Sequence, residues 1–245
     1  MNANDSLVLI VVISVLGPIL GSLIGVIKRP SLLYLCNMLC FAAGVMLAIS
    51  FLELVPQSIS LSTVWICGLG VVIGSFVMYL LDILLPHLHP GLCMQEQGRN
   101  LKRTAVYLIV GIFLHNFPEG MAIAIGEVAD TKVSLIIALA IAIHNIPEGI
   151  CTSGPYFHAT GARIKSFLLS ASTAIPILAG FITARHLYHE ITGDLIAIII
   201  GATAGLMIYI SADELIPAAC QSGAGHRTIF SLIAGALLVI VLGGI

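Results

Sequence analysis

The sequence has 245 residues, of which 59% are hydrophobic and only 9% are charged, and its formal net charge is −2. Soluble domains carry about 25% charged residues, so a soluble chain of this composition would expose large apolar patches to water. The composition therefore excludes an ordinary water-soluble domain, and the small net charge gives no indication of a nucleic-acid partner. The expected solvent is a lipid bilayer.

Apolar segments of membrane-crossing length recur along the whole chain. A helix needs ~20 mostly apolar residues to cross the hydrocarbon core, where only helices and closed barrels satisfy their backbone groups. The first run, after residue 5, lacks the basic leader of a signal peptide and is expected to be retained. We predict an all-α membrane protein, one transmembrane domain over residues 1–245. Its eight spans are expected near 7–27, 32–54, 63–85, 104–126, 133–154, 165–185, 195–216 and 228–245.

The basic residues predict the orientation of these spans. The connections after spans 1, 3, 5 and 7 hold Lys28, Arg29, Arg99, Lys102, Arg103, Arg163, Lys165 and Arg227. The opposite side holds only Lys132 and Arg185. Because cytoplasmic loops are enriched in Lys and Arg, both termini are expected outside the cytoplasm, and residues 86–103 form a cytoplasmic loop.

Spans 2 and 7 contain related sequences. Residues 44–56 read GVMLAISFLELVP and residues 205–217 read GLMIYISADELIP, with Gly, Met, Ser, Glu, Leu and Pro in register. These two spans cross the membrane in opposite directions, so the repeat is inverted. We predict a 3+2+3 arrangement in which helices 1–3 and 6–8 are inverted copies around helices 4 and 5, a plan that recurs in transporters.

Spans 4 and 5 each contain the pattern HNxPEG, at residues 115–120 and 144–149. Charged groups inside a membrane are costly and usually face a cavity or a partner. The His and Glu of each copy are four residues apart, so a helix presents both on one face, and consecutive spans are antiparallel. The sequence therefore predicts a shared metal site. Its ligands are His115, Asn116, Glu119, His144, Asn145 and Glu148.

The donor types narrow the choice of ion. Imidazole with carboxylate suits zinc, iron, manganese or cobalt, whereas copper(I) favours Cys and Met and calcium favours oxygen alone. Zinc is the first expectation and iron the second. Pro118 and Pro147 each remove one helix hydrogen bond, as expected for kinked helices that line an ion path. The two glutamates either bridge two metals or take up a proton when the ion leaves, and the sequence does not choose between these roles.

The paired motif, with three spans before it and three after it, resembles the ZIP (Zrt/Irt-like) family of divalent metal transporters over the whole chain. The resemblance implies import of zinc into the cytoplasm, and of iron, manganese, cadmium or cobalt as alternatives. It also implies alternating access or an elevator-like movement, a homodimer and a two-metal centre that uses the six residues named above. Some bacterial members have a Glu just before the Pro of span 6, where this chain has Ile175, so one well-held metal is expected.

Further polar residues are expected at the ends of the path. Glu53 is predicted to end span 2 on the outer side, as an entrance. The predicted exit on the inner side comprises Asp82, His87, His89, Asp213 and Glu214. The alternative, that all of these are interfacial residues solvated at helix ends, stays open. The six cysteines show no CxxC spacing and are interpreted as small buried apolar residues.

The main alternative to transport is an intramembrane metal-dependent hydrolase, which also needs His and carboxylate ligands. It would require an open coordination position with a water and a general base, and the HExxH pattern is absent. A metal exporter of another family would place its ligands on non-consecutive helices. We therefore expect an importer in a prokaryotic inner membrane and no enzymatic activity.

Overall fold

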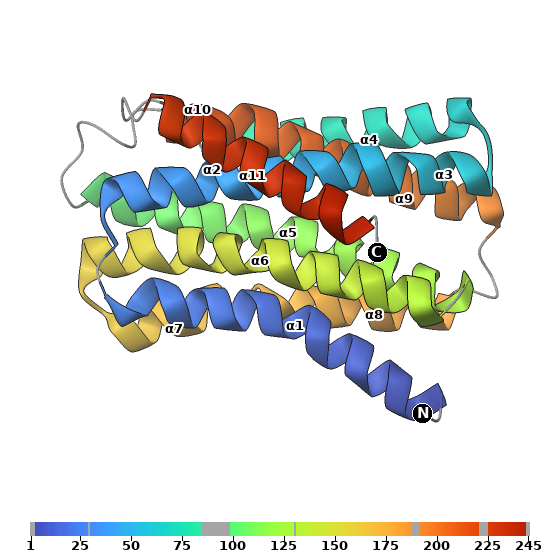
Figure 1. The fold of residues 1–245 in the computed structure, drawn as a ribbon, viewed down its shortest axis with the longest axis horizontal. Helices are drawn as coiled ribbons and strands as arrows, with labels where there is room; N and C mark the ends of the chain where they lie inside the picture. Colours follow the sequence, from blue (N-terminus) through green and yellow to red (C-terminus); the bar gives the residue numbers. More distant parts are fainter. Residues whose placement is uncertain are drawn as a thin grey trace.

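The computed structural model describes residues 3–28, 30–84, 99–129, 131–187, 192–220 and 225–243. All secondary structure in this part of the chain is helical, which confirms the all-α prediction (Figure 1). The α-helices are α1 (Ala3–Ile27), α2 (Leu32–Ile49), α3 (Val55–Leu61), α4 (Val64–Leu84), α5 (Arg99–Ala129), α6 (Thr131–Thr160), α7 (Arg163–Ala171), α8 (Ala174–Leu187), α9 (Gly193–Ile210), α10 (Ile216–Cys220) and α11 (His226–Gly243). Two π-helical segments, η1 (Ser50–Leu54) and η4 (Ser211–Leu215), join α2 to α3 and α9 to α10.

Several helical stretches have the length and apolar composition of membrane spans. Four of them, Val8–Ile27, Leu33–Leu61, Arg163–Leu187 and Gly193–Leu215, are long enough to cross a bilayer. Shorter apolar helices cover Val64–Leu80, Ile109–Ile125 and His226–Val241. Large apolar side chains on the outside, such as Trp65 and Phe230, are exposed, as expected for contact with lipid.

One set of helices, which we call the motif group, consists of α1, α5, α6, α7 and α8. Glycines bring its helices into backbone contact. A Cβ atom added at Gly21 on α1 would lie 2.1 Å from the carbonyl oxygen of Ile146 on α6. A Cβ atom at Gly120 on α5 would lie 2.0 Å from the carbonyl oxygen of Ile177 on α8. Because any larger residue would force these helices apart, the group is tightly packed around the two motifs.

The remaining long helices, α2, α4, α9 and α11 with α3, form a second set that we call the flanking group. It is joined in the same way. A Cβ atom at Gly74 on α4 would lie 1.9 Å from the carbonyl oxygen of Ala202 on α9, and one at Gly44 on α2 would lie 2.0 Å from that of Leu232 on α11. Glycine contacts in the flanking group therefore join its long helices in two pairs, α4 with α9 and α2 with α11.

The two groups meet mainly where α2 packs against α6 and α5 against α9. Two glycines of the motif group, Gly154 and Gly111, contact side chains outside that group. A Cβ atom at Gly154 on α6 would lie 3.0 Å from Cγ of Pro30 and 3.1 Å from Cδ2 of Leu35. One at Gly111 on α5 would meet only Cε of Met78, at 3.9 Å. At these two glycines the groups meet through side-chain atoms, whereas the glycines within each group meet backbone atoms.

The related sequences of spans 2 and 7 share an irregularity of the backbone. Both switch to π-helix at a buried serine, Ser50 in one and Ser211 in the other, and return to α-helix before the proline. Pro56 sits in the first turn of α3, where a missing backbone N–H is tolerated. The prediction that Glu53 ends its span is therefore wrong, because the helical path continues to Leu61. The path that contains Asp213 likewise continues beyond it, to Cys220.

Candidate metal centre

The two HNxPEG motifs lie on neighbouring long helices, α5 and α6, which are separated by one residue of the chain. The Ser134 hydroxyl on α6 donates a hydrogen bond of 2.9 Å to the carbonyl oxygen of Ile123 on α5, which fixes the register of the pair. Pro118 and Pro147 both lie inside these helices. The antiparallel hairpin therefore brings together residues that are about thirty positions apart in the sequence.

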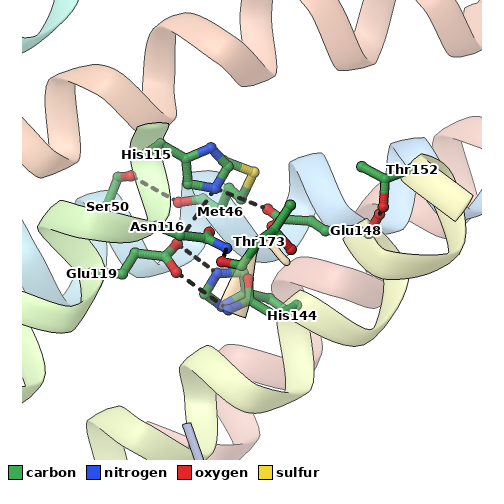
Figure 2. Close-up of polar contacts among 10 residues, drawn as sticks. Met46, Ser50, His115, Asn116, Glu119, His144, Glu148, Thr152 and Thr173 are labelled. Atoms are coloured by element: carbon green, nitrogen blue, oxygen red, sulfur yellow. Dashed lines mark hydrogen bonds and ion pairs between the residues drawn. The ribbon is translucent and has the colours of Figure 1, made fainter. Parts of the chain in front are cut away.

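The structure places the imidazoles and carboxylates of both motifs against one another (Figure 2). His144 Nε2 lies 2.9 Å from Glu119 Oε1, and His115 Nε2 lies 3.6 Å from the same oxygen. His115 Nε2 also lies 3.4 Å from Glu148 Oε1. Asn145 Nδ2 donates to Glu119 Oε2 at 3.3 Å. Each helix thus supplies one carboxylate that reaches an imidazole of the other helix.

This cluster is buried and contains more acceptor atoms than donors. All six predicted ligands are at most 2% exposed. Neither Glu148 carboxylate oxygen has a hydrogen-bond partner, nor do the amide oxygens of Asn116 and Asn145 or the ring nitrogens of His115. A buried polar atom without a partner costs about 1–3 kcal/mol, so these atoms together favour a bound cation.

Asn116 is oriented by a break in the helix of span 6. Its Nδ2 donates a hydrogen bond of 2.7 Å to the carbonyl oxygen of Thr173, in the turn between α7 and α8 (Figure 2). This contact turns the Asn116 amide oxygen away from Thr173 and leaves it available as a ligand. Ile175, the residue just before Pro176, is 58% exposed and does not line the cluster. A carbonyl group, rather than the Ile175 side chain, therefore faces the motifs at this break.

The polar groups of the cluster contact each other rather than a common centre. Within the described part of the chain, no three His, Cys, Asp or Glu side chains are arranged to hold a metal ion as they stand. A metal that binds here has to replace the bond between His144 and Glu119 and draw the ligands inward. In this structure the candidate ligands therefore bond one another and do not surround one metal position.

The other predicted residues have different environments. Glu53 is exposed on η1, Asp213 is exposed on η4, and Glu214 is half-buried beside it. Asp82 belongs to the last turn of α4, and its side chain, like the whole of His87 and His89, lies outside the described residues.

A group of buried hydroxyls next to the cluster was not predicted. The Ser170 hydroxyl is 2.6 Å from that of Ser22 and also bonds that of Thr152, one helical turn beyond Glu148. Thr152 Oγ1 donates to the carbonyl oxygen of Glu148 at 3.0 Å. In the sequence, only the position of Thr152, four residues after Glu148, indicates this group. Its partners on other helices could not be predicted from the sequence.

Comparison with known proteins agrees with this arrangement. The family model described as ZIP zinc transporter matches residues 92–243. The chain is 37% identical over 224 residues to the zinc transporter ZupT of Enterobacter sp. (strain 638), covering 88% of this chain and 87% of the relative. It is 36% identical over 224 residues to the zinc transporter ZupT of Escherichia coli O127:H6, with the same coverage.

The chain belongs to the ZIP zinc transporter family. It is therefore an integral membrane protein that transports a divalent metal ion, and not an enzyme, so the hydrolase alternative is discarded. Its relatives are bacterial, in agreement with the expected prokaryotic inner membrane. In this ZIP protein one HNxPEG motif lies within α5 and the other within α6.

Proposed function

We propose that this protein imports divalent metal ions, zinc foremost, into the cytoplasm through the His, Asn and Glu cluster of α5 and α6. Iron, manganese, cadmium and cobalt are secondary substrates because their ions also accept imidazole and carboxylate ligands. The observation that carries the proposal is the convergence of both motifs. Three imidazole–carboxylate contacts of 2.9–3.6 Å join four buried ligand side chains from the two helices.

The buried cluster supports transport over permanent storage of the ion. Glu119 is held by His144 and Asn145 before the ion arrives, so the cost of losing these bonds opposes metal binding. The carboxylate oxygens of Glu148 and the amide oxygen of Asn116, which have no hydrogen bond, favour binding. Because one contribution favours metal binding and the other opposes it, the ion is held less tightly, which suits a site that must release its ion.

Alternating access is proposed as a movement of the motif group against the flanking group. Backbone contacts at glycines hold each group together, and the glycine contacts between the groups involve side chains. The interior of a closely packed unit does not deform continuously. Such units therefore slide or rotate against each other as rigid bodies between discrete arrangements. The ligands on α5 and α6 would travel with the motif group.

The eight-span arrangement, the inverted repeat and the homodimer belong to the same proposal. The shared π-helical step at Ser50 and Ser211 supports a common origin for spans 2 and 7. Both π-segments also carry an acidic residue, with Glu53 on the proposed entrance side and Glu214 on the exit side. With both termini outside, an ion that passes from Glu53 to the cluster and then to Glu214 moves inward.

Uptake of radioactive zinc into metal-starved cells or proteoliposomes tests the proposal. His144→Ala and Glu148→Ala each remove one ligand and are expected to reduce the initial rate to near the background of empty vesicles. His158→Ala, which removes an exposed imidazole from the same helix, is the matched control and should retain wild-type uptake. Wild-type rates in both ligand variants would contradict the assignment, and uptake only from the cytoplasmic face would contradict import.

A further inference from the structure

Residues 170–173, where α7 ends and the chain turns into α8, contact both HNxPEG motifs. At one end, the Ser170 hydroxyl donates a hydrogen bond of 3.2 Å to the carbonyl oxygen of Gly149, the last residue of the second motif. At the other end, the carbonyl oxygen of Thr173 accepts a hydrogen bond of 2.7 Å from Asn116 of the first motif (Figure 2). One short segment of span 6 is therefore bonded to both halves of the candidate metal centre.

A chain of buried hydroxyls strengthens the contact with the second motif. Ser170 bonds Thr152 on α6, and its Oγ lies 2.6 Å from that of Ser22 on α1; all three residues are 0% exposed. The Ser22 hydroxyl donates to the carbonyl oxygen of Pro18 at 2.6 Å. Each hydroxyl has a single proton, so a chain that runs from Thr152 to the Pro18 carbonyl lets all three donate once. The chain joins three helices of the motif group one helical turn from Glu148.

The two ends of residues 170–173 are also bonded to each other. The Thr173 hydroxyl donates to the carbonyl oxygen of Ser170 at 2.8 Å, and the Thr173 backbone N–H donates to the same oxygen at 3.0 Å. The Ser172 hydroxyl donates to the carbonyl oxygen of Leu169 at 2.7 Å. These bonds hold the turn in one shape. The contact with the first motif and the contact with the second therefore do not vary independently.

Glu148 depends on this support because little else holds its side chain. Its carboxylate oxygens have no hydrogen bond among the described residues, and its ion-pair contact is the one with His115 at 3.4 Å. The Thr152 hydroxyl lies 3.0 Å from the backbone carbonyl oxygen of Glu148. A displacement of this turn of α6 would therefore move the carboxylate with the backbone that carries it.

We propose that residues 170–173, bonded to Thr152 and Gly149 on one side and to Asn116 on the other, form a brace that sets the distance between the two motifs and so the zinc affinity of the centre. Ser170 and Thr152 are positioning residues that act through the motif residues they bond. The brace rests on the proposed function, since it matters only if the motifs bind the transported ion. Groups that hold metal ligands in place commonly contribute about 10–100-fold to metal affinity.

Zinc uptake into proteoliposomes at increasing zinc concentrations tests the brace at Thr152. Thr152→Val removes the hydroxyl and keeps the branched shape, and is expected to raise the apparent KM about tenfold with a smaller change in the maximal rate. Thr152→Ser keeps the hydroxyl and should retain the wild-type KM. The matched control is Thr203→Val, which alters a buried threonine of α9 whose hydroxyl bonds the carbonyl oxygen of Ile199 in its own helix. It should also retain the wild-type KM.

A second pair of variants tests the brace from α7. Ser170→Ala removes the partner that Thr152 bonds and should raise the apparent KM by a similar factor. Ser166→Ala is the matched control: it lies one turn earlier on α7, is equally buried, and bonds the carbonyl oxygen of Ala162 in its own helix. The double variant Thr152→Val with Ser170→Ala should be no worse than the more impaired single variant, because both substitutions break the same bond. Melting temperatures identify any variant that is unfolded, and the other pair then decides.

The outcomes separate the brace from the function on which it rests. A wild-type KM in Thr152→Val or in Ser170→Ala overturns the brace, and so does an equal rise in Thr152→Ser or in Ser166→Ala. Two single effects that multiply in the double variant also overturn it, because the hydroxyls then act separately. In all these cases Glu148→Ala still loses uptake. Wild-type uptake in Glu148→Ala overturns the proposed function instead.

Discussion

Gly21→Ala is expected to impair transport although Gly21 is not a ligand. The new Cβ atom would lie 2.1 Å from the carbonyl oxygen of Ile146, which stands between Asn145 and Pro147 in the second motif. An ordinary contact begins near 3.4 Å, so α1 and α6 must separate by about 3.4 − 2.1 = 1.3 Å. Overpacking of this kind commonly costs about 1–3 kcal/mol of folding free energy.

The same displacement acts on the metal centre. The two carboxylate–imidazole contacts between α5 and α6 are 2.9 and 3.4 Å long, and the share of the displacement that α6 takes up lengthens or breaks them. Binding sites must keep their ligands within about 0.5 Å of the working geometry. We expect zinc uptake to fall about tenfold or more, since misplacement by about 1 Å is known to cost up to 100-fold in enzymes.

Zinc uptake, normalised to the amount of protein in the membrane, and the melting temperature are the two measurements. Gly68→Ala is the control, because a Cβ atom there meets nothing within 4 Å. The glycine is on α4, so the variant changes the same residue type in another span. If Gly21→Ala and Gly68→Ala both keep wild-type uptake and melting temperature, close packing of α1 does not position the second motif.

Two further variants probe the centre and its support. Glu119→Gln removes the charge that accepts bonds from His144 and Asn145 and should weaken apparent zinc affinity about 10–100-fold. The control Asp194→Asn should leave the apparent zinc affinity unchanged. The affinity is measured from uptake at increasing zinc concentrations, and equal affinities of the two variants would refute this role of Glu119. Gly25→Ala meets the Ser153 hydroxyl at 2.1 Å, so adding Ser153→Ala should restore part of the lost melting temperature, and no recovery would refute that contact as the cause.

The sequence was sufficient to predict the all-helical fold and the convergence of the two motifs. The His and Glu of each motif are four residues apart, and this spacing alone puts them on one helix face. Consecutive spans are antiparallel, so the second face meets the first at similar depth. These are local rules of helix geometry and connectivity, and the contacts among His115, Glu119, His144 and Glu148 follow from them.

The contacts that were not predicted depend on the approach of distant segments or on subtle backbone choices. Asn116 bonds the backbone carbonyl of Thr173, 57 residues away. The helix breaks at Thr173, although no proline stands at that position. Glu53 was predicted to end its span, but a π-helical segment covers it, Pro56 lies in the first turn of α3 and the helix continues. Propensity rules describe isolated helices and do not report how neighbours change their winding.

The glycine contacts also constrain how the protein is made in the membrane. Each joins helices that are far apart in the chain: α1 with α6, α5 with α8, α4 with α9, and α2 with α11. Helices emerge from the ribosome in order, so α2 and α4 enter the bilayer long before their partners exist. Until α9 and α11 follow, the surfaces around Gly74 and Gly44 face lipid. A nascent chain that stops before α9 would therefore leave the backbone surfaces around Gly74 and Gly44 without their helix partners.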